Sequence, residues 1–236
     1  MRLLLISNSA SPGEKYLERP AEHIGSFLSS VSEDIVFIPF AGVTFSHDEY
    51  VERVNNALAH VGVKVRGIHT YKHPLKAVAE AGAIVVGGGN TFRLVRMMQE
   101  QGLIEAIRER VRAGAPYVGW SAGSNVACPT ICTTNDMPIL EPRSFEGLGL
   151  IPFQINPHYL DTHPENHGGE TREQRILEYI AANPEMYVAG LREGSRFVVE
   201  DNKLTLVGER TLRIFKQGVA PYELTTEDDL SFLMER

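Results

Sequence analysis

The sequence has few of the features that mark secreted, membrane or nucleic-acid-binding proteins. Cys128 and Cys132 are the only cysteines among 236 residues, too few for a disulfide framework and wrongly spaced for a zinc site. No apolar stretch approaches the length of a membrane span. No basic run exceeds two residues, and the net charge is −7, which argues against a nucleic-acid-binding surface. We therefore expect a cytoplasmic protein with no nucleic-acid or membrane partner.

The composition is that of a folded chain with a sizeable core. Hydrophobic residues make up 43% of the chain and charged residues 22%, which is typical of globular domains and unlike disordered ones. No linker rich in proline, glycine or serine, and no shift in composition, divides the chain. The sequence therefore predicts a single domain over residues 1–236.

Strand-like and helical patterns alternate through the first half of the chain. Strands are predicted at residues 3–7, 35–40, 63–69, 83–86 and 117–118, and helices at residues 16–30, 48–60, 76–81, 92–101 and 103–113. This alternation predicts βαβ units, and hence an α/β fold with a mostly parallel sheet and helices on both faces. Such a sheet binds ligands beyond the carboxyl ends of its strands.

The second half of the chain has shorter and differently arranged elements. A strand-like segment at 148–155 ends before Asn156, and a helix is predicted from residue 171 to 182. Short strands are predicted at residues 187–191, 196–199, 204–207 and 212–215. The last three have the tight connections of antiparallel strands at a sheet edge. We therefore expect a small antiparallel C-terminal part.

One motif, at residues 119–123, has the pattern G-x-S-x-G in the setting that a nucleophile needs. A buried strand leads into it and a short segment that can form a helix, 125–128, follows. The two glycines permit a sharp turn around Ser121, whose hydroxyl would then lie at the carboxyl end of the strand. Small residues also occur in ordinary strand–helix turns, but the strand before the motif favours a nucleophilic serine.

A serine nucleophile requires a base and a group that orients the base. In one sequence order of the three residues, the acid lies between the serine and the histidine, and it would then be Asp136, Glu141 or Glu146. The other order places the acid last: His158 follows a strand-like segment, and Glu193 follows the strand predicted at 187–191. Both would then lie at the same sheet edge as Ser121. This position favours catalytic roles for the two residues over the simpler interpretation, in which His158 is a loop histidine bonded to backbone and Glu193 a solvated carboxylate.

Backbone N–H groups near Ser121 could stabilise an oxyanion. Residues 87–89 are three glycines that follow a predicted strand, without the spacing or the lysine of a nucleotide-binding loop. The N–H groups of Gly88 or Gly89, together with that of Ala122 after the serine, are therefore candidate oxyanion donors.

A metal site is the alternative use of the histidines in this region. One polar loop holds four candidate ligands, His158, Asp161, His163 and His167. Their spacing matches no zinc signature, and the proline and glycines within and after the group indicate an irregular loop and not one helical face. We therefore expect no metal and no cofactor.

The predicted helix after this loop begins with an unusual charge. Thr171 and Gln174 fit a capping box, which places Arg172 in the first turn, where a cation opposes the helix dipole. Nearby glutamates offer a simple electrostatic compensation. The sharper interpretation is that Arg172 receives an anionic substrate group, because an acidic protein attracts an anion only through a local cation.

With these residues in view, the sequence resembles the dipeptidase E (aspartyl dipeptidase) family of serine peptidases, which is related to cyanophycinase. The resemblance extends to about residue 194 and is carried by residues 37–44, 85–92, 119–123, 133–138, 154–158 and 169–175. It implies a fold akin to the class I glutamine amidotransferases, although Ser121 stands where those enzymes carry a cysteine. It also suggests a homodimer.

The resemblance implies a site and a substrate. The family's Ser-His-Glu triad falls on Ser121, His158 and Glu193, and its substrates are Asp-X dipeptides, small peptides cleaved after an N-terminal aspartate. Recognition of that aspartate falls on Arg172, and the same resemblance assigns Asn135, Asp136 and Thr44 to substrate binding. One departure is Arg192, where the family pattern predicts a proline before the glutamate. The alternatives are a cyanophycinase-like hydrolase of β-linked aspartyl peptides and a non-catalytic ligand-binding module.

Overall fold

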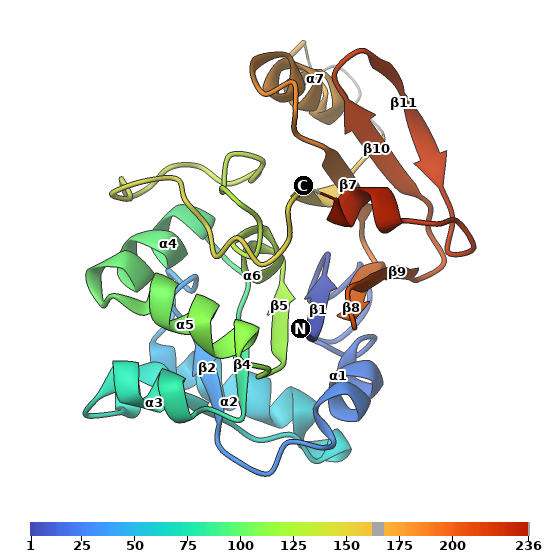
Figure 1. Cartoon of the computed structure of the whole chain (residues 1–236). Coiled ribbons are helices and arrows are strands. Elements are labelled where there is room, and N and C mark those ends of the chain that lie inside the picture. Colours follow the sequence, from blue (N-terminus) through green and yellow to red (C-terminus); the bar gives the residue numbers. More distant parts are fainter. Residues whose placement is uncertain (162–167, 236) are drawn as a thin grey trace.

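Seven strands form the larger of two sheets in the computed structural model, which describes residues 1–161 and 168–235 (Figure 1). Its order is β3-β2-β4-β5-β1-β8-β9. The strands are β1 (Leu3–Ile6), β2 (Ile35–Ile38), β3 (Val65–Gly67), β4 (Ala83–Val86), β5 (Tyr117–Trp120), β8 (Arg196–Glu200) and β9 (Lys203–Val207). The five from β3 to β1 are parallel, whereas β8 is antiparallel to both of its neighbours.

Helices cover both faces of this sheet, which is why its central strands are apolar throughout and not alternating. One face carries α3 (Pro74–Glu80), α4 (Thr91–Glu100) and α5 (Leu103–Arg112), and the other carries α1 (Ala21–Leu28) and α2 (His47–Leu58). Along β1, Leu3 and Leu5 join the core under the first group, while Leu4 and Ile6 join the core under the second. The predicted α/β architecture with helices on both faces is confirmed.

The smaller sheet lies beside the carboxyl end of the first one, at the upper right of Figure 1. Its order is β11-β10-β7-β6. Its elements are β6 (Gln154–Tyr159), β7 (Val188–Arg192), β10 (Leu212–Lys216) and β11 (Val219–Leu224), with α7 (Arg172–Ala182) packed on it. β6 and β7 are parallel and the other pairs antiparallel, so this C-terminal part is mixed. One buried cluster contains Ile155 and Leu191 of this sheet together with Leu5 of the other.

The remaining helical turns are short. They are α6 (Ala122–Asn125) and three 3-10 turns, η1 (Ala59–Val61), η2 (Ile68–Thr70) and η3 (Ser231–Met234). Longer helices begin at side-chain caps: Ser46 and Glu49 form a capping box before α2, and Asn90 caps α4 directly after the three glycines. Within the described ranges no helix combines the length and apolar character that crossing a membrane requires.

The strand predicted at 148–155 is wrong over most of its length. β6 begins only at Gln154, so His158 lies within a strand and not beyond one. The apolar residues before it are buried in a loop, where Leu148 donates to the carbonyl of Val126 and Leu150 to that of Ala127. Burial alone explains their composition, because a buried loop and a buried strand leave the same apolar signature.

The edge positions predicted for three C-terminal strands are wrong for two of them. β8 lies between β1 and β9, and β10 lies between β7 and β11, so only β9 is at an edge. The strand that covers β10 is β11, which the sequence did not predict. Its residues are exposed or half-buried and include Pro221, so it lacks the alternating apolar pattern on which strand prediction depends.

Truncation of a leucine in the central strand tests this architecture. Leu5→Ala empties a fully buried position in β1, and we expect the free energy of unfolding to fall by about 2–5 kcal/mol. The matched control is Leu177→Ala on α7, where the side chain is 37% exposed and a change within about 0.5 kcal/mol is expected. Urea denaturation measures both, and equal losses would contradict the packing of β1 between two helical layers.

Candidate active site

Ser121 lies in a strained turn between β5 and α6. Its φ of 53° and ψ of −112° fall in a region that non-glycine residues rarely adopt, at a cost of about 1–3 kcal/mol. The turn is tight enough that a Cβ on Gly123 would overlap the carbonyl oxygen of Val86 in β4. The predicted strand and turn are confirmed, but the helix predicted at 125–128 is misplaced: α6 spans Ala122–Asn125 and shares only Asn125 with it.

His158 connects Ser121 to Glu193 through both of its ring nitrogens. Nε2 lies 2.9 Å from Ser121 Oγ, and Nδ1 lies 2.7 Å from Glu193 Oε1. The prediction that all three share one sheet edge is wrong, because His158 lies on β6 and Glu193 directly follows β7, both in the smaller sheet. The chain of hydrogen bonds therefore spans the junction between the two sheets.

A β-bulge turns His158 towards the serine. Pro157 pairs with Leu191 and Tyr159 with Arg192, so His158 is the extra residue on β6, with a φ of 53°. The bulge leaves its backbone groups outside the strand ladder, yet both are bonded.

The N–H of His158 donates to Ser7 Oγ at 2.9 Å, and its carbonyl accepts from Arg172 Nη1 at 2.9 Å. Ser7 Oγ in turn donates to the Leu191 carbonyl at 2.8 Å. The Ser7 hydroxyl was not predicted as part of the site, since on the sequence Ser7 is only the polar residue that ends the strand predicted at 3–7.

Asp136, one of the three competing acids, contacts other residues and not His158. Its Oδ2 accepts from the N–H and the hydroxyl of Thr91 at 2.7 and 2.6 Å, and from Thr134 Oγ1 at 3.1 Å. These contacts fix the start of α4 to the loop that follows α6. Of the four candidate acids, Glu193 is the one that contacts the His158 ring within the described residues.

Asn135 and Thr44, also assigned to substrate binding, differ in how they relate to His158. Asn135 donates to the Pro157 carbonyl at 2.7 Å and accepts from Asn156 at 2.7 Å, so it buttresses β6 beside the bulge. Thr44 is exposed on the loop after β2, and its side chain makes no hydrogen bond within the described residues. The structure thus brings Arg172, but not Thr44, against the histidine.

The candidate oxyanion donors are unbonded in the part of the chain that the structure describes: the N–H groups of Gly88, Gly89 and Ala122 donate to no protein atom there. Gly88 lies so close to the nucleophile that a Cβ on it would be 3.0 Å from Ser121 Cβ. Tyr50 donates to the Gly88 carbonyl at 2.8 Å. Because a trans peptide directs C=O and N–H oppositely, this bond also fixes the direction of the Gly89 N–H.

The buried Tyr50 and the half-buried Tyr16 support that peptide. Tyr16 donates to Tyr50 at 3.3 Å, and its ring lies edge-on to Trp120, the residue before the serine. Burial raises the pKa of both tyrosines, so each hydroxyl remains a neutral donor. Neither residue was predicted as part of the site, since on the sequence Tyr50 is one apolar position of a helix.

Arg172 is a half-buried cation beside the histidine. The predicted capping box of Thr171 and Gln174 is confirmed, and it starts α7 with Arg172 as the first helical residue. Burial lowers the pKa of Arg172, and the charge of Arg175 acts in the same direction. Among residues 1–161 and 168–235 no carboxylate forms an ion pair with it; its contact there is the His158 carbonyl. A partly dehydrated guanidinium that forms no ion pair within those two ranges is suited to an anionic ligand.

Two of the four candidate metal ligands, His158 and Asp161, are bonded to protein side chains. Both ring nitrogens of His158 are bonded as described, and Asp161 forms an ion pair with Arg192. His163 and His167 lie outside the described residues.

The chain is similar to known proteins over most of its length. The model of peptidase family S51 matches residues 3–207. A protein named peptidase E from Nostoc sp. is 48% identical over 235 residues, covering 100% of this chain and 97% of that protein. A second peptidase E, from Salmonella typhimurium, is 50% identical over 218 residues, covering 92% and 95%.

Two solved structures share the fold. A candidate peptidase E protein from Listeria monocytogenes aligns with a TM-score of 0.64 at 23% identity, covering 89% of this chain and 98% of that chain. A peptidase from an acI-B1 Actinobacterium aligns with a TM-score of 0.71 at 19% identity, covering 98% and 96%.

The tight turn at Ser121 can be tested by adding one methyl group. Gly123→Ala should lower the free energy of unfolding by about 1–3 kcal/mol, because the new Cβ meets immovable backbone of β4. It should also slow the reaction of Ser121 with an organophosphate. The control is Gly168→Ala, where a Cβ meets nothing within 4 Å and neither quantity should change. A Gly123→Ala protein with wild-type stability would contradict the described turn.

Proposed function

The chain belongs to peptidase family S51, and on this premise we propose that it is a serine dipeptidase that releases N-terminal aspartate from Asp-X dipeptides. The observation that carries the proposal is the hydrogen-bonded series from Ser121 through His158 to Glu193. Nucleophile, base and orienting acid are within direct reach of one another, as acyl transfer by a serine requires.

In the proposed mechanism, His158 Nε2 takes the proton of Ser121 as Oγ attacks the carbonyl carbon of the substrate aspartate. The oxyanion that forms is held by the N–H of Ala122 and one from Gly88 or Gly89. When the peptide C–N bond breaks, His158 returns the proton to the leaving amine. Water, deprotonated by the same nitrogen, then hydrolyses the aspartyl ester and regenerates the hydroxyl.

Glu193 acts on the opposite side of the ring. Its carboxylate accepts the proton on Nδ1, which leaves Nε2 free to act as the base and stabilises the imidazolium that forms. The bulge supports this assignment, because it places His158 between two residues that belong to different sheets.

Arg172 supplies the proposed specificity for aspartate. A guanidinium can contact both oxygens of a carboxylate, and only one of its nitrogens is bonded within the described chain. An N-terminal aspartate bound to Ser121 through its own carbonyl has a side chain one methylene long, so its carboxylate must be met close to the nucleophile. A cation that touches His158 satisfies this requirement.

Substitutions of the three residues test the mechanism. Ser121→Ala and His158→Ala should each lower kcat by roughly a million-fold, and Glu193→Gln by roughly ten-thousand-fold, since members of such a unit act together. Each variant should unfold close to the wild-type temperature, because no large core side chain is removed. The measurement is hydrolysis of an Asp-X dipeptide. A fully active Glu193→Gln enzyme would contradict the assigned acid.

Substitution of Arg172 tests the specificity. Arg172→Ala should reduce kcat/KM for Asp-X by about 1,000-fold or more, and wild-type enzyme should prefer Asp-X over Asn-X by roughly 10,000-fold, because an uncharged analogue leaves the buried cation unpaired. Arg172→Lys should recover only part of the loss. A panel of Asp-X, Asn-X, Glu-X and β-Asp-X peptides measures both, and faster cleavage of β-Asp-X would favour the β-linked alternative.

The contact between Arg172 and His158 requires a control. Labelling of Ser121 by an uncharged organophosphate reports the nucleophile without the substrate carboxylate, and Arg172→Ala should leave its rate within about threefold of wild type. Arg175→Ala, in the same helical turn and 66% exposed, should leave both rates unchanged. Equal losses in labelling and in Asp-X cleavage would show that Arg172 serves the histidine and not the substrate.

A further inference from the structure

Arg192 is the residue directly before Glu193, and it is unusual for an arginine because it is only 9% exposed. It occupies the position at which the family resemblance predicts a proline. A proline would fix its own φ near −65° and so restrict the backbone that carries the glutamate. An arginine imposes no such restriction, so in this chain something else must hold Glu193 in place.

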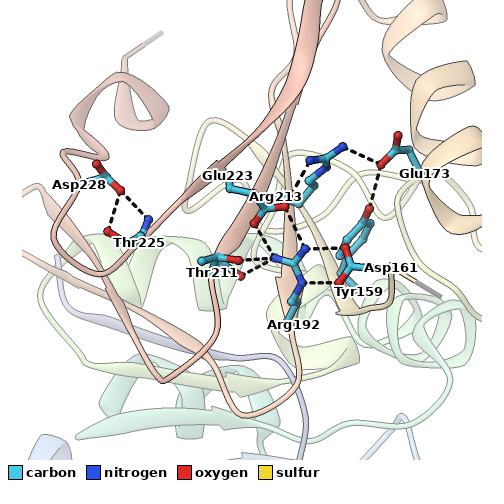
Figure 2. A network of polar contacts seen from close by, with 9 residues as sticks. All are labelled: Tyr159, Asp161, Glu173, Arg192, Thr211, Arg213, Glu223, Thr225 and Asp228. Carbon is cyan, nitrogen blue, oxygen red and sulfur yellow. Dashed lines mark hydrogen bonds and ion pairs between the residues drawn. The ribbon is translucent and has the colours of Figure 1, made fainter.

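The guanidinium of Arg192 uses all five of its N–H groups (Figure 2). Nε and Nη2 donate to the two oxygens of Asp161 at 2.8 and 2.5 Å. Nη1 and Nη2 donate to the two oxygens of Glu223 at 2.8 and 3.0 Å. Nη1 also donates to the carbonyl and hydroxyl oxygens of Thr211 at 2.7 and 2.9 Å. The double fork is the most geometrically restrictive arrangement that a guanidinium can make.

The partners of Arg192 lie in or beside the other three strands of the smaller sheet. Asp161 follows β6, Thr211 precedes β10, and Glu223 lies on β11, while Arg192 itself ends β7. Around it, Arg213 joins Glu223 to Glu173 of α7, as Figure 2 shows. The network therefore ties the ends of the strands to one another on the side where β6 and β7 carry the site.

The charges in the network are mutually stabilised. Hydrogen bonding to Arg192 holds the pKa of Asp161 below its usual value. Burial pushes the pKa of Glu223 upwards, but its hydrogen bonds to Arg192 and Thr211, together with the charges of Arg192 and Arg213, outweigh burial, so the pKa is lowered. The two carboxylates in return raise the pKa of Arg192. All three groups are thus ionised at neutral pH, and removal of the cation would leave two carboxylates facing each other.

The position of this network relative to the bulge gives it a function. His158 is the bulged residue, and the next pair in the β6–β7 register is Tyr159 with Arg192. The paired hydrogen bonds between Arg192 and Asp161 link β6 to β7 immediately beyond the bulge. On the other side of the bulge, Ser7 links the two strands through its bonds to the Leu191 carbonyl and the His158 N–H. A non-glycine residue with positive φ persists only where its surroundings determine it on both sides.

We propose that Arg192 is a positioning residue for the reaction, because its forks to Asp161 and Glu223 hold the Glu193 carboxylate on Nδ1 of His158. The inference rests on the proposed function, since it assigns to Glu193 the orienting role. It adds that this chain secures the acid with a buried arginine network at the position of the expected proline.

The test is Arg192→Lys, which keeps the charge but cannot form two forks. We expect kcat for Asp-X to fall about 10- to 100-fold with KM changed less than about threefold, because the base is misaligned while the substrate pocket is intact. Labelling of Ser121 by an organophosphate should slow by the same factor. Asp161→Asn, at a 58% exposed side chain, breaks one fork at little risk to folding and should lower both rates in the same direction.

A matched control separates positioning from stability. Arg108 on α5 also donates from all three nitrogens, to Glu105 and to the carbonyls of Gly147 and Leu148, at a place remote from the bulge. Arg108→Lys should lower the unfolding temperature yet leave kcat and labelling within about twofold. If Arg192→Lys behaves in the same way, with reduced stability and unchanged kcat, the proposal is wrong.

A double substitution identifies the group through which Arg192 acts. In a Glu193→Ala background, adding Arg192→Lys should change the labelling rate less than about twofold, because the positioned carboxylate is already absent. An undiminished further loss would contradict action through Glu193. Because labelling needs no dipeptide, a wild-type protein that is labelled but cleaves no Asp-X would refute the proposed substrate while the effect of Arg192→Lys on labelling still decides this inference.

Discussion

The hydrogen bond between Ser121 Oγ and His158 Nε2 joins the two sheets of the structure. Ser121 directly follows β5 of the larger sheet, whereas His158 lies on β6 and Glu193 directly follows β7, both of the smaller one. The site therefore exists only while the sheets remain docked, and a buried cluster shared by both holds them together. The strain at Ser121 and at His158, each with a φ of 53°, is tolerated because this packing leaves neither residue room to relax.

Two arginines near the histidine have opposite surroundings, and the contrast suggests different roles. Arg192 is saturated by two carboxylates and a threonine, so it is bound within the protein and adds rigidity. Arg172 contacts the His158 carbonyl and forms no ion pair with any described residue, so its charge is available. A protein with a net charge of −7 has little other means of attracting an anionic substrate to this point. The proposed specificity thus depends on an arginine with no ion pair among the described residues, and the proposed rigidity on an arginine paired with two carboxylates.

The sequence was sufficient for the five parallel strands of the larger sheet and for the turn at Ser121, because both depend on local patterns. Apolar runs alternating with amphipathic helices predict parallel βαβ units, and G-x-S-x-G after a strand predicts the turn at Ser121. The smaller sheet was harder to predict. The apolar residues at 148–153 have the composition of a buried strand although they form a loop, and the residues of β11 are too exposed to show a strand pattern. The bulge at His158 and the Ser7, Tyr50 and Arg192 contacts could not be predicted, since they join residues that only the tertiary fold brings together.

The central claim is that Ser121 becomes acylated by an aspartyl group during turnover. Rapid acid quenching during hydrolysis of an activated aspartyl ester tests it most directly, because an ester acylates faster than an amide and lets the intermediate accumulate. The account predicts one aspartyl group per chain, found by peptide mass spectrometry on Ser121 and absent from the His158→Ala variant. Turnover of the ester without any covalent species, or with the aspartyl group on another residue, would contradict it.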